Sequence, residues 1–213
     1  MPPIDTTYYP DGTVLHLWQV TEDITALMEC CKNLGITPPN TMNCTKRMKE
    51  KLIEALLLHH IFGKIVTLGH TQSGAPTIDI DRCHISISHT SGWIAIAKNY
   101  NHNIGIDIER CSSRILRVRE KFLNTQELAF IAHDDIIENT LAWTAKEALY
   151  KLFEGCGGAS LSDHYAIDKS RLHNNGYITH SAKAAISPNE QLCIMSQIIP
   201  DAVISLAVAA KYL

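Results

Sequence analysis

Two acidic residues stand two positions apart in the segment 105–109 (GIDIE). The alternation of apolar and polar residues predicts a strand, on which Asp107 and Glu109 project from one face while Ile106 and Ile108 enter the core. Two carboxylates on one face repel each other, and a divalent cation relieves that repulsion. Such oxygen ligands suit Mg²⁺ or Mn²⁺ better than Zn²⁺. An isolated pair of this kind is more often a solvated strand face. The pair therefore indicates a metal site only in combination with other motifs of the chain.

A second charged group occupies residues 143–151 (WTAKEALYK). The pattern predicts a helix, on which Glu147 and Lys151 share a face because they are four residues apart. Lys146 adds another positive charge to this segment. By itself the Glu147–Lys151 pair would be an ordinary exposed ion pair of little energetic weight.

A histidine follows the short apolar strand that begins the segment 85–91 (ISISHTS). Because His89 stands beside hydroxyl side chains at a chain corner, it could donate a hydrogen bond to a phosphate oxygen and become more cationic as it does so. A lone histidine at a strand end is more often a structural hydrogen-bond partner. Together, the three segments indicate a function more specifically than any one of them does.

The elements that would position these groups follow from hydrophobic periodicity and from glycine and proline. Helices are expected over residues 22–34, 45–62, 120–130 and 141–153, the last stopped by Gly155, Gly157 and Gly158. Strands are expected over residues 13–20, 104–108, 165–167, 177–181, 191–198 and 203–209, and residues 83–97 should form two strands about a Ser91-Gly92 turn. A helix followed by strand pairs in each half predicts an α+β fold.

The two halves share short sequence features. Glu54-Ala55-Leu56 in one helix matches Glu147-Ala148-Leu149 in the other, and strand pairs in both halves end in alternating apolar residues and alanines. The spacing is not constant, so the repeat is only suggestive. We expect two similar halves, residues 1–103 and 104–213, each a helix packed on a small antiparallel sheet.

Composition narrows the classes of function. The 213 residues carry a net charge of −3, so no overall positive field is present to hold nucleic acid or an anionic membrane surface. The seven cysteines form no CxxC pair, which argues against a disulfide framework and a structural zinc site. No stretch approaches the roughly 20 apolar residues that span a bilayer. We expect a cytoplasmic protein.

In their order along the chain, Ser88-His89, the acidic segment 105–109 and the helix 143–151 resemble the motifs of the 4'-phosphopantetheinyl transferase superfamily. Residues 122–127 (FLNTQE) resemble the family's segment between its two acidic motifs, and the whole resemblance covers about residues 46–158. The length and the two-half pattern resemble the larger subtype, a monomer in which one chain forms a pseudo-dimer. The resemblance implies transfer of phosphopantetheine from coenzyme A to a serine of an apo acyl or peptidyl carrier protein, with release of 3',5'-ADP.

The resemblance also implies roles for individual residues. Asp107, Glu109 and Glu147 would hold Mg²⁺, or Mn²⁺ in its place, at the coenzyme A diphosphate. Lys151 would stabilise the leaving oxygen, with Lys146 adding positive potential nearby. Glu147 is the first candidate to accept the proton of the carrier serine, and Glu109 is the alternative. The implied coenzyme A contacts are Ser88, His89, Lys146 and Lys151.

Two positions depart from the family's pattern. Ala75 stands where relatives carry the lysine of a Gly-Lys-Pro segment, and Ala55 stands about where an arginine is common. Candidate ligands for the coenzyme A 3'-phosphate are then the cations at the start of the 45–62 helix, which are Lys46, Arg47 and Lys49. These could equally be a solvated helix start. We expect weaker coenzyme A binding than in a relative with the full motif.

Other functions stay open at this point. The chain could keep the fold and bind coenzyme A or a carrier protein without transferring anything, or it could be a metal-dependent phosphohydrolase that uses water as the nucleophile. For a transferase, we expect a basic or apolar strip for carrier docking near residues 120–130, with Lys121 in it. The sequence leaves open which carrier protein and which pathway the chain would serve.

Overall fold

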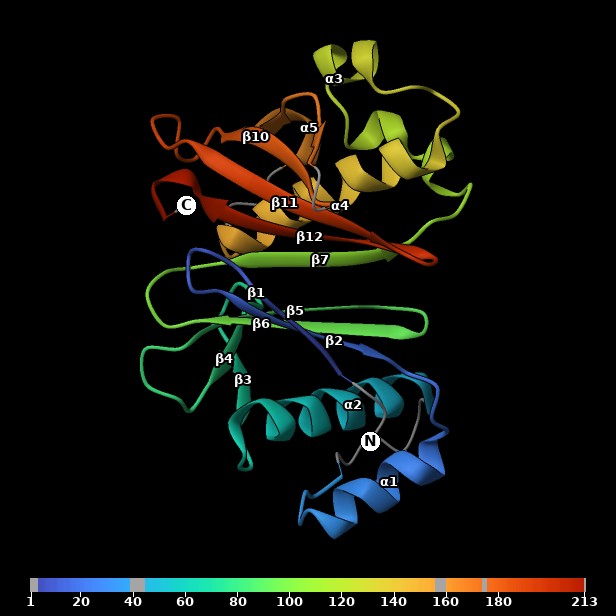
Figure 1. Ribbon diagram of the computed structural model, residues 1–213, viewed down its shortest axis with the longest axis vertical. Coiled ribbons are helices and arrows are strands. Elements are labelled where there is room, and N and C mark those ends of the chain that lie inside the picture. The colour runs from blue at the N-terminus through green and yellow to red at the C-terminus, as the bar shows by residue number, and fades with distance from the viewer. Residues whose placement is uncertain (1–3, 39–44, 156–159, 174–175, 213) are drawn as a thin grey trace.

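The computed structural model of the protein describes residues 4–38, 45–155, 160–173 and 176–212. Its α+β fold places two antiparallel sheets next to each other, with the long helices on their outer sides (Figure 1). Gly157 and Gly158, and the cysteines at positions 44 and 156, lie outside the described residues.

The N-terminal sheet has the strand order β1-β2-β6-β5. Its strands are β1 (Asp5–Tyr8), β2 (Val14–Gln19), β5 (His84–Thr90) and β6 (Trp93–Asn99). One face of this sheet packs with α1 (Ile24–Asn33) and α2 (Thr45–Phe62), where Trp18, Ile94 and Ile96 share a core with apolar residues of both helices. A separate hairpin of β3 (Leu68–His70) and β4 (Pro76–Ile78) leads from α2 to β5.

The C-terminal sheet has the order β7-β12-β11-β10-β8, with β9 paired to β10. Its strands are β7 (Gly105–Arg110), β8 (Tyr165–Ile167), β9 (Arg171–Leu172), β10 (Ile178–Ala184), β11 (Leu192–Ile199) and β12 (Ala202–Ala209). Its helices are α3 (Thr125–Phe130), α4 (Ile136–Leu152) and α5 (Leu161–His164). α4 covers the sheet, and Ala145, Ala148 and Leu149 of this helix pack against residues such as Ala207.

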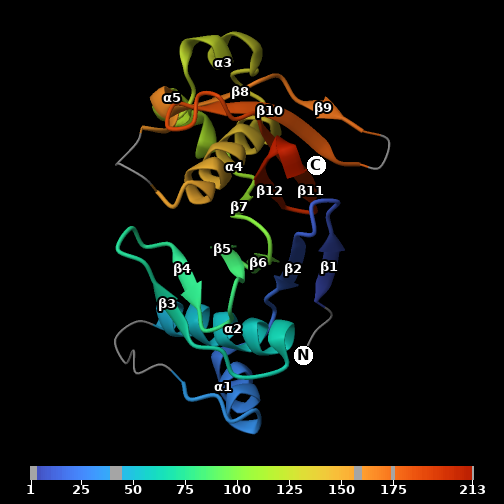
Figure 2. The ribbon, with the colours of Figure 1, turned by 90° about the vertical axis from the view of Figure 1, so that its left-hand side faces the viewer.

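The inner faces of the two sheets form a third core between the halves. Leu15 and Ala95 of the N-terminal sheet pack there with Ile106 and Ile108 of β7 and with Leu206 of β12. Both isoleucines of β7 are fully buried, as the alternation in the sequence predicts. Figure 2 shows, from the side, that β7 and β12 face β5, β6 and β2 across this layer.

A polar contact also joins the halves at one end of this layer. The indole nitrogen of Trp93, at the start of β6, donates to Asp201 Oδ1 at 2.7 Å. Arg110 at the end of β7 pairs with Asp201 Oδ2 at 2.8 Å. The turn between β11 and β12 is thereby tied to both sheets.

The two halves share a strand topology. In each, a strand that precedes the long helix pairs with the last strand of that half, which in turn pairs with the strand before it: β2-β6-β5 and β7-β12-β11. Glu54 and Glu147 occupy the long helices α2 and α4 of the two halves. This correspondence supports the predicted duplication, and the pseudo-dimer itself stays a prediction.

The segment predicted as one helix over residues 120–130 is different in the structure. Two short 3₁₀ turns, Ile115–Arg117 and Arg119–Lys121, precede the short helix α3. The Asn124 side chain accepts from the Glu127 backbone N–H, and the Glu127 side chain accepts from the Asn124 backbone N–H. This reciprocal cap starts a new helix after residue 124, and a helix cannot run through its own cap.

Two findings bear on the classes of function. Among the described residues, no helix combines the length and the apolarity needed to cross a bilayer. The cysteines that the structure describes, at positions 30, 31, 83, 111 and 193, are free thiols. This finding is consistent with the prediction of no disulfide framework, for the described part of the chain.

Candidate active site

Asp107 is the central carboxylate of the candidate site. It lies on β7 with only 7% of its surface exposed. Its Oδ1 atom accepts a hydrogen bond from the Ser88 hydroxyl at 2.8 Å and another from the Lys151 ammonium, also at 2.8 Å. Three elements, β5, β7 and α4, therefore meet at one carboxylate oxygen.

Glu147 and Glu109 complete the acidic group, and their electrostatics show that the three carboxylates act on one another. Burial and the charge of Asp107 raise the pKa of Glu147 to about 6, with Lys151 opposing this and Glu109 adding to it. Burial and Asp107 also raise the pKa of Glu109, against the lowering effect of Arg114, Lys151 and the Thr90 hydroxyl. These couplings support the prediction that Asp107, Glu109 and Glu147 meet beside Lys151, and the shared site stays a prediction.

A glycine permits the close packing that brings these acids together. A methyl group at Gly105, the first residue of β7, would overlap the carbonyl oxygen of Ala148 and come within 2.5 Å of the Leu152 nitrogen. Because Gly105 has no side chain, the backbone of α4 can lie directly against that of β7. Glu147 and Lys151 on α4 consequently face Asp107 and Glu109 on β7.

The donor set fits a hard divalent cation. The charge of Asp107 raises the pKa of both Glu109 and Glu147, so these acids gain from a counter-charge, and oxygen donors are those that Mg²⁺ selects. Over the described ranges, no three or more Asp, Glu, His or Cys side chains are drawn together closely enough to form a finished metal centre. The positive charge at Asp107 in this structure is the Lys151 ammonium.

The cations of α2 line a hollow that continues from this acidic group. One part is bordered by Lys51, His70, His89, Asp107 and Lys151, among others. The adjoining part is lined by Lys46, Arg47, Glu50, Lys51, Glu54 and His89. Lys46, Arg47 and His89 thus line a hollow whose other part is bordered by Asp107.

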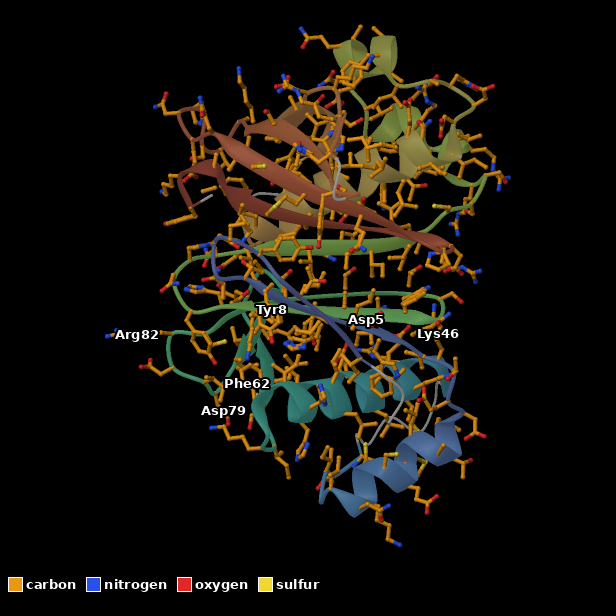
Figure 3. The ribbon with its side chains drawn as sticks, viewed as in Figure 1. Asp5, Tyr8, Lys46, Phe62, Asp79 and Arg82 are labelled. Carbon is orange, nitrogen blue, oxygen red and sulfur yellow. The ribbon has the colours of Figure 1, made fainter. Side chains whose placement is uncertain are left out.

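His89 and the first turn of α2 are held near each other. His89 Nδ1 lies 3.9 Å from Glu50 Oε1, and Lys46 Nζ lies 3.9 Å from the same oxygen. Lys46 and Lys49 also line a hollow with the β5–β6 turn, and Figure 3 shows Lys46 at that side of the molecule. The long, exposed side chain of Lys46 stays free to follow a ligand.

Lys146 does not reach the site. The prediction that it adds positive potential near coenzyme A is therefore wrong. Its ammonium is fully buried and donates to Glu127 Oε2 at 2.5 Å and to the Phe122 carbonyl at 2.7 Å. Burial lowers the pKa of Lys146, and Glu127 opposes that. At about 100° per residue, Lys146 lies roughly 140° around the helix from Lys151, so the two lysines serve opposite sides of α4.

Ser88 also differs from its predicted role. Its side chain is buried, its oxygen accepts from the Ile108 backbone N–H at 3.2 Å, and its hydroxyl hydrogen points to Asp107. The hydroxyl proton is committed to a carboxylate and is not available to a coenzyme A phosphate. The predicted direct contact is therefore replaced by a contact with an acid of the site.

Three titratable residues that line the hollow were not predicted as site residues from the sequence: Lys51, Glu54 and His70. Lys51 Nζ donates to the buried Glu54 carboxylate at 2.6 Å. Lys51 lies four residues after Arg47, one helical turn further along the same face, and that spacing is the signal that could have identified it. No local signal indicated His70, because its position depends on how the β3–β4 hairpin folds back.

The two departures from the family pattern lie in different places. Ala75 lines a cavity between the β3–β4 hairpin and the end of α4, together with Lys151. Ala55 packs against the core under α2. The alanine at position 75 therefore leaves a wall of the candidate site without a cation, while Ala55 contributes to the packing of the N-terminal half.

Comparison with known proteins finds similarity to one family over about half of the chain. Residues 103–205 match the 4'-phosphopantetheinyl transferase superfamily. The chain is 32% identical over 128 residues to the 4'-phosphopantetheinyl transferase gsp of Aneurinibacillus migulanus, covering 58% of this chain and 52% of that protein. It is 30% identical over 122 residues to the 4'-phosphopantetheinyl transferase Sfp of Bacillus subtilis (strain 168), covering 55% and 52%.

The matched part of the chain spans about half the length of these curated relatives. It includes β7 with Asp107 and Glu109, and α4 with Glu147 and Lys151. The residues that meet at the acidic site thus lie inside the matched region. Over these residues the chain is similar to the 4'-phosphopantetheinyl transferase superfamily and to two curated 4'-phosphopantetheinyl transferases.

Proposed function

We propose that the protein transfers the 4'-phosphopantetheine group of coenzyme A to a serine of an apo acyl or peptidyl carrier protein and releases 3',5'-ADP. The observation that carries the proposal is the electrostatic coupling of Asp107, Glu109 and Glu147 beside Lys151, in the part of the chain that is similar to this superfamily. The names of the two relatives support the reaction class.

The hollow along α2 and β5 supports a binding mode for the donor. Lys46, Arg47 and Lys49 would bind the coenzyme A 3'-phosphate, and His89 would contact a phosphate between them and the acidic group. Lys51 lies on the same path and adds a cation that the sequence did not suggest. We expect this cluster to compensate in part for the missing lysine at position 75.

The acidic residues would hold Mg²⁺, with Mn²⁺ as a substitute. Asp107, Glu109 and Glu147 are the proposed ligands, and the ion would neutralise charge on the diphosphate when bound. Lys151 would then direct its ammonium to the leaving oxygen, where negative charge develops in the transition state. No covalent intermediate with the protein is needed, because the serine can attack the phosphorus in line with the leaving group.

The attacking serine must lose a proton, and Glu147 is the proposed acceptor. Its carboxylate is half-buried on α4 and faces the acidic edge of β7, where the reacting phosphorus would lie. Glu109 is the alternative, because it lies on the same edge and is also half-buried. A general base of this kind contributes about 10²–10⁴-fold to a rate.

The decisive experiment is an assay with a purified apo carrier protein, coenzyme A and Mg²⁺. Transfer adds the mass of phosphopantetheine, about 340 Da, to the carrier in an intact-mass spectrum. We expect the shift with Mg²⁺ or Mn²⁺ and its loss with a chelator. A carrier whose mass stays unchanged under all conditions would contradict the proposed activity.

A non-catalytic coenzyme A-binding protein is the alternative that a specific observation favours. Ala75 leaves the cavity beside Lys151 without the cation that relatives carry there. Calorimetric binding of coenzyme A without any transfer to the carrier would support this alternative. The retained acids and Lys151 favour transfer, because they would serve the reacting phosphate more than general docking.

Carrier docking near residues 120–130 stays a prediction. Lys121 is exposed in a 3₁₀ turn of this segment. A fall in carrier affinity on Lys121→Ala, with unchanged coenzyme A affinity, is the expected outcome. The oligomeric state, expected to be monomeric, can be measured by light scattering on the same preparation.

A further inference from the structure

Strands β5 and β7 lie next to each other at the edges of the two sheets, but they are not neighbours in either sheet. Two serines of β5 make the connection instead. The backbone N–H of Ile106 donates to Ser86 Oγ at 3.0 Å, and that of Ile108 donates to Ser88 Oγ at 3.2 Å. Both serines are buried and two residues apart, so they act as equivalent acceptors for the edge of β7.

The two serines differ in what their hydroxyl hydrogens do. The Ser88 hydroxyl donates to Asp107 Oδ1 at 2.8 Å, and the Lys151 ammonium donates to the same oxygen. A serine hydroxyl has one hydrogen to donate, so that of Ser88 is committed to this carboxylate. Asp107 Oδ2 accepts no hydrogen bond from any residue in the described part of the chain.

We propose that Ser88 is a positioning residue of the site: it fixes Asp107 Oδ1 toward β5 and thereby presents Oδ2 to the divalent cation. This inference rests on the proposed function. A residue of the N-terminal half thus orients a carboxylate of the C-terminal half. Outer hydrogen bonds of this kind set the orientation and basicity of a metal-binding carboxylate.

The geometry explains why the carboxylate needs such a contact. Asp107 has one torsion that rotates its carboxylate plane, and burial alone does not select an orientation. The Lys151 ammonium holds Oδ1 in this structure, but in the proposed reaction it moves to the leaving oxygen. Ser88 sits on a strand and is anchored by the Ile108 N–H, so it keeps its place when Lys151 leaves.

Ser86→Ala is the matched control for Ser88→Ala. Each variant removes one buried hydroxyl that accepts a hydrogen bond from a backbone N–H of β7. Only Ser88→Ala also removes a donor to Asp107. A purely structural role predicts the same effects for both variants, and a positioning role predicts different ones.

Mn²⁺ affinity in the presence of coenzyme A, measured by electron paramagnetic resonance without carrier, provides a readout that is independent of activity. We expect Ser88→Ala to weaken Mn²⁺ binding by about tenfold or more, and Ser86→Ala to leave it within about twofold of the wild type. Both should lower the melting temperature by similar amounts. In the transfer assay, Ser88→Ala should lower kcat and change the KM for coenzyme A little.

Two outcomes would overturn the proposal: equal Mn²⁺ affinities for Ser88→Ala and Ser86→Ala, or no Mn²⁺ binding by the wild type with coenzyme A. Failure of the proposed function has a different signature. If the wild type modifies no carrier while only Ser88→Ala weakens Mn²⁺ binding, the transfer reaction is wrong and the positioning role stands.

Discussion

At the scale of single residues, two lysines of α4 show how different the environments on one helix can be. Lys151 is partly exposed and pairs with Asp107, whereas Lys146 is fully buried and pairs with Glu127. Glu127 also accepts from the backbone N–H groups of Asn124 and Ile167. Lys151 therefore lies in the candidate site, and Lys146 fastens α4 to the segment that precedes it.

The acidic site gives the first prediction at this scale. Glu147→Gln should lower the transfer rate by about 10²-fold or more, because it removes the proposed base and a proposed metal ligand. The variant should melt no lower than the wild type, since burial and two nearby acids disfavour the charge of Glu147. Intact-mass kinetics and differential scanning fluorimetry test both points. A variant that transfers at the wild-type rate would exclude Glu147 from the reaction.

The buried Lys146–Glu127 pair gives the second prediction. Lys146→Met should destabilise the protein by about 3–5 kcal/mol, because it leaves the Glu127 carboxylate buried without its counter-charge. Adding Glu127→Leu should recover a large part of that loss, since no unpaired charge is then left. Urea unfolding of the single and double variants measures the coupling. Additive losses would show that the two side chains do not act as a pair.

At the scale of elements, the approach of α4 to β7 decides whether the site exists. Asp107 and Glu109 come from the strand, and Glu147 and Lys151 come from the helix. The space between these elements at Gly105 is too small for any side chain. The geometry of the candidate site therefore depends on a position that carries no functional group.

Gly105→Ala tests this dependence. The added methyl group would overlap the backbone of α4, which cannot move locally, so we expect a loss of about 3 kcal/mol or more in stability. Any folded fraction should bind Mn²⁺ with coenzyme A more weakly than the wild type.

The control is Gly63→Ala at the end of α2, where φ is +65° and nothing lies within 4 Å of the added methyl group. It should cost only about 1 kcal/mol, the strain of a left-handed backbone. Similar stability losses for the two variants would refute the close-approach explanation.

At the scale of the whole molecule, the two sheets share a core, and their outer faces are covered by helices. His16 of β2 lies on the α2 side of the N-terminal sheet, where its ring makes an edge contact with His60 and its Nδ1 lies 3.1 Å from Thr6 Oγ1. Burial, with the nearby Lys98 and His60, lowers the pKa of His16 to about 4. The folded protein therefore resists protonation of this histidine, while the unfolded chain does not.

This difference predicts acid sensitivity. Between about pH 6.5 and pH 4 the unfolded chain binds a proton at His16 that the folded protein does not, so stability falls as the pH falls through this window. The contribution is roughly 1–3 kcal/mol. His16→Asn should flatten that part of a plot of unfolding free energy against pH.

The exposed His133 serves as the control, and His133→Asn should leave the profile unchanged. If His16→Asn and the wild type have parallel profiles from pH 7.5 to pH 4.5, His16 does not contribute to the acid sensitivity. Urea unfolding at several pH values provides the measurement.

The sequence by itself indicated most of the local elements and the candidate residues of the site. Alternation placed Ile106 and Ile108 in the core, and the four-residue spacing put Glu147 and Lys151 on one helical face, because both periodicities are properties of the local backbone. The family resemblance predicted that these segments form one site. The match over residues 103–205 supports that resemblance, and the electrostatic coupling of the acids supports the predicted site, which stays a prediction.

The tertiary structure decided which polar side chain faces which partner. Lys146 and Lys151 have the same chemistry, and only the packing of α4 against β7 and Phe122 shows which one is buried. Ser88 became a partner of Asp107 because β5 and β7 meet across the two halves. Such contacts join residues far apart in sequence, and no local periodicity encodes the distance between them.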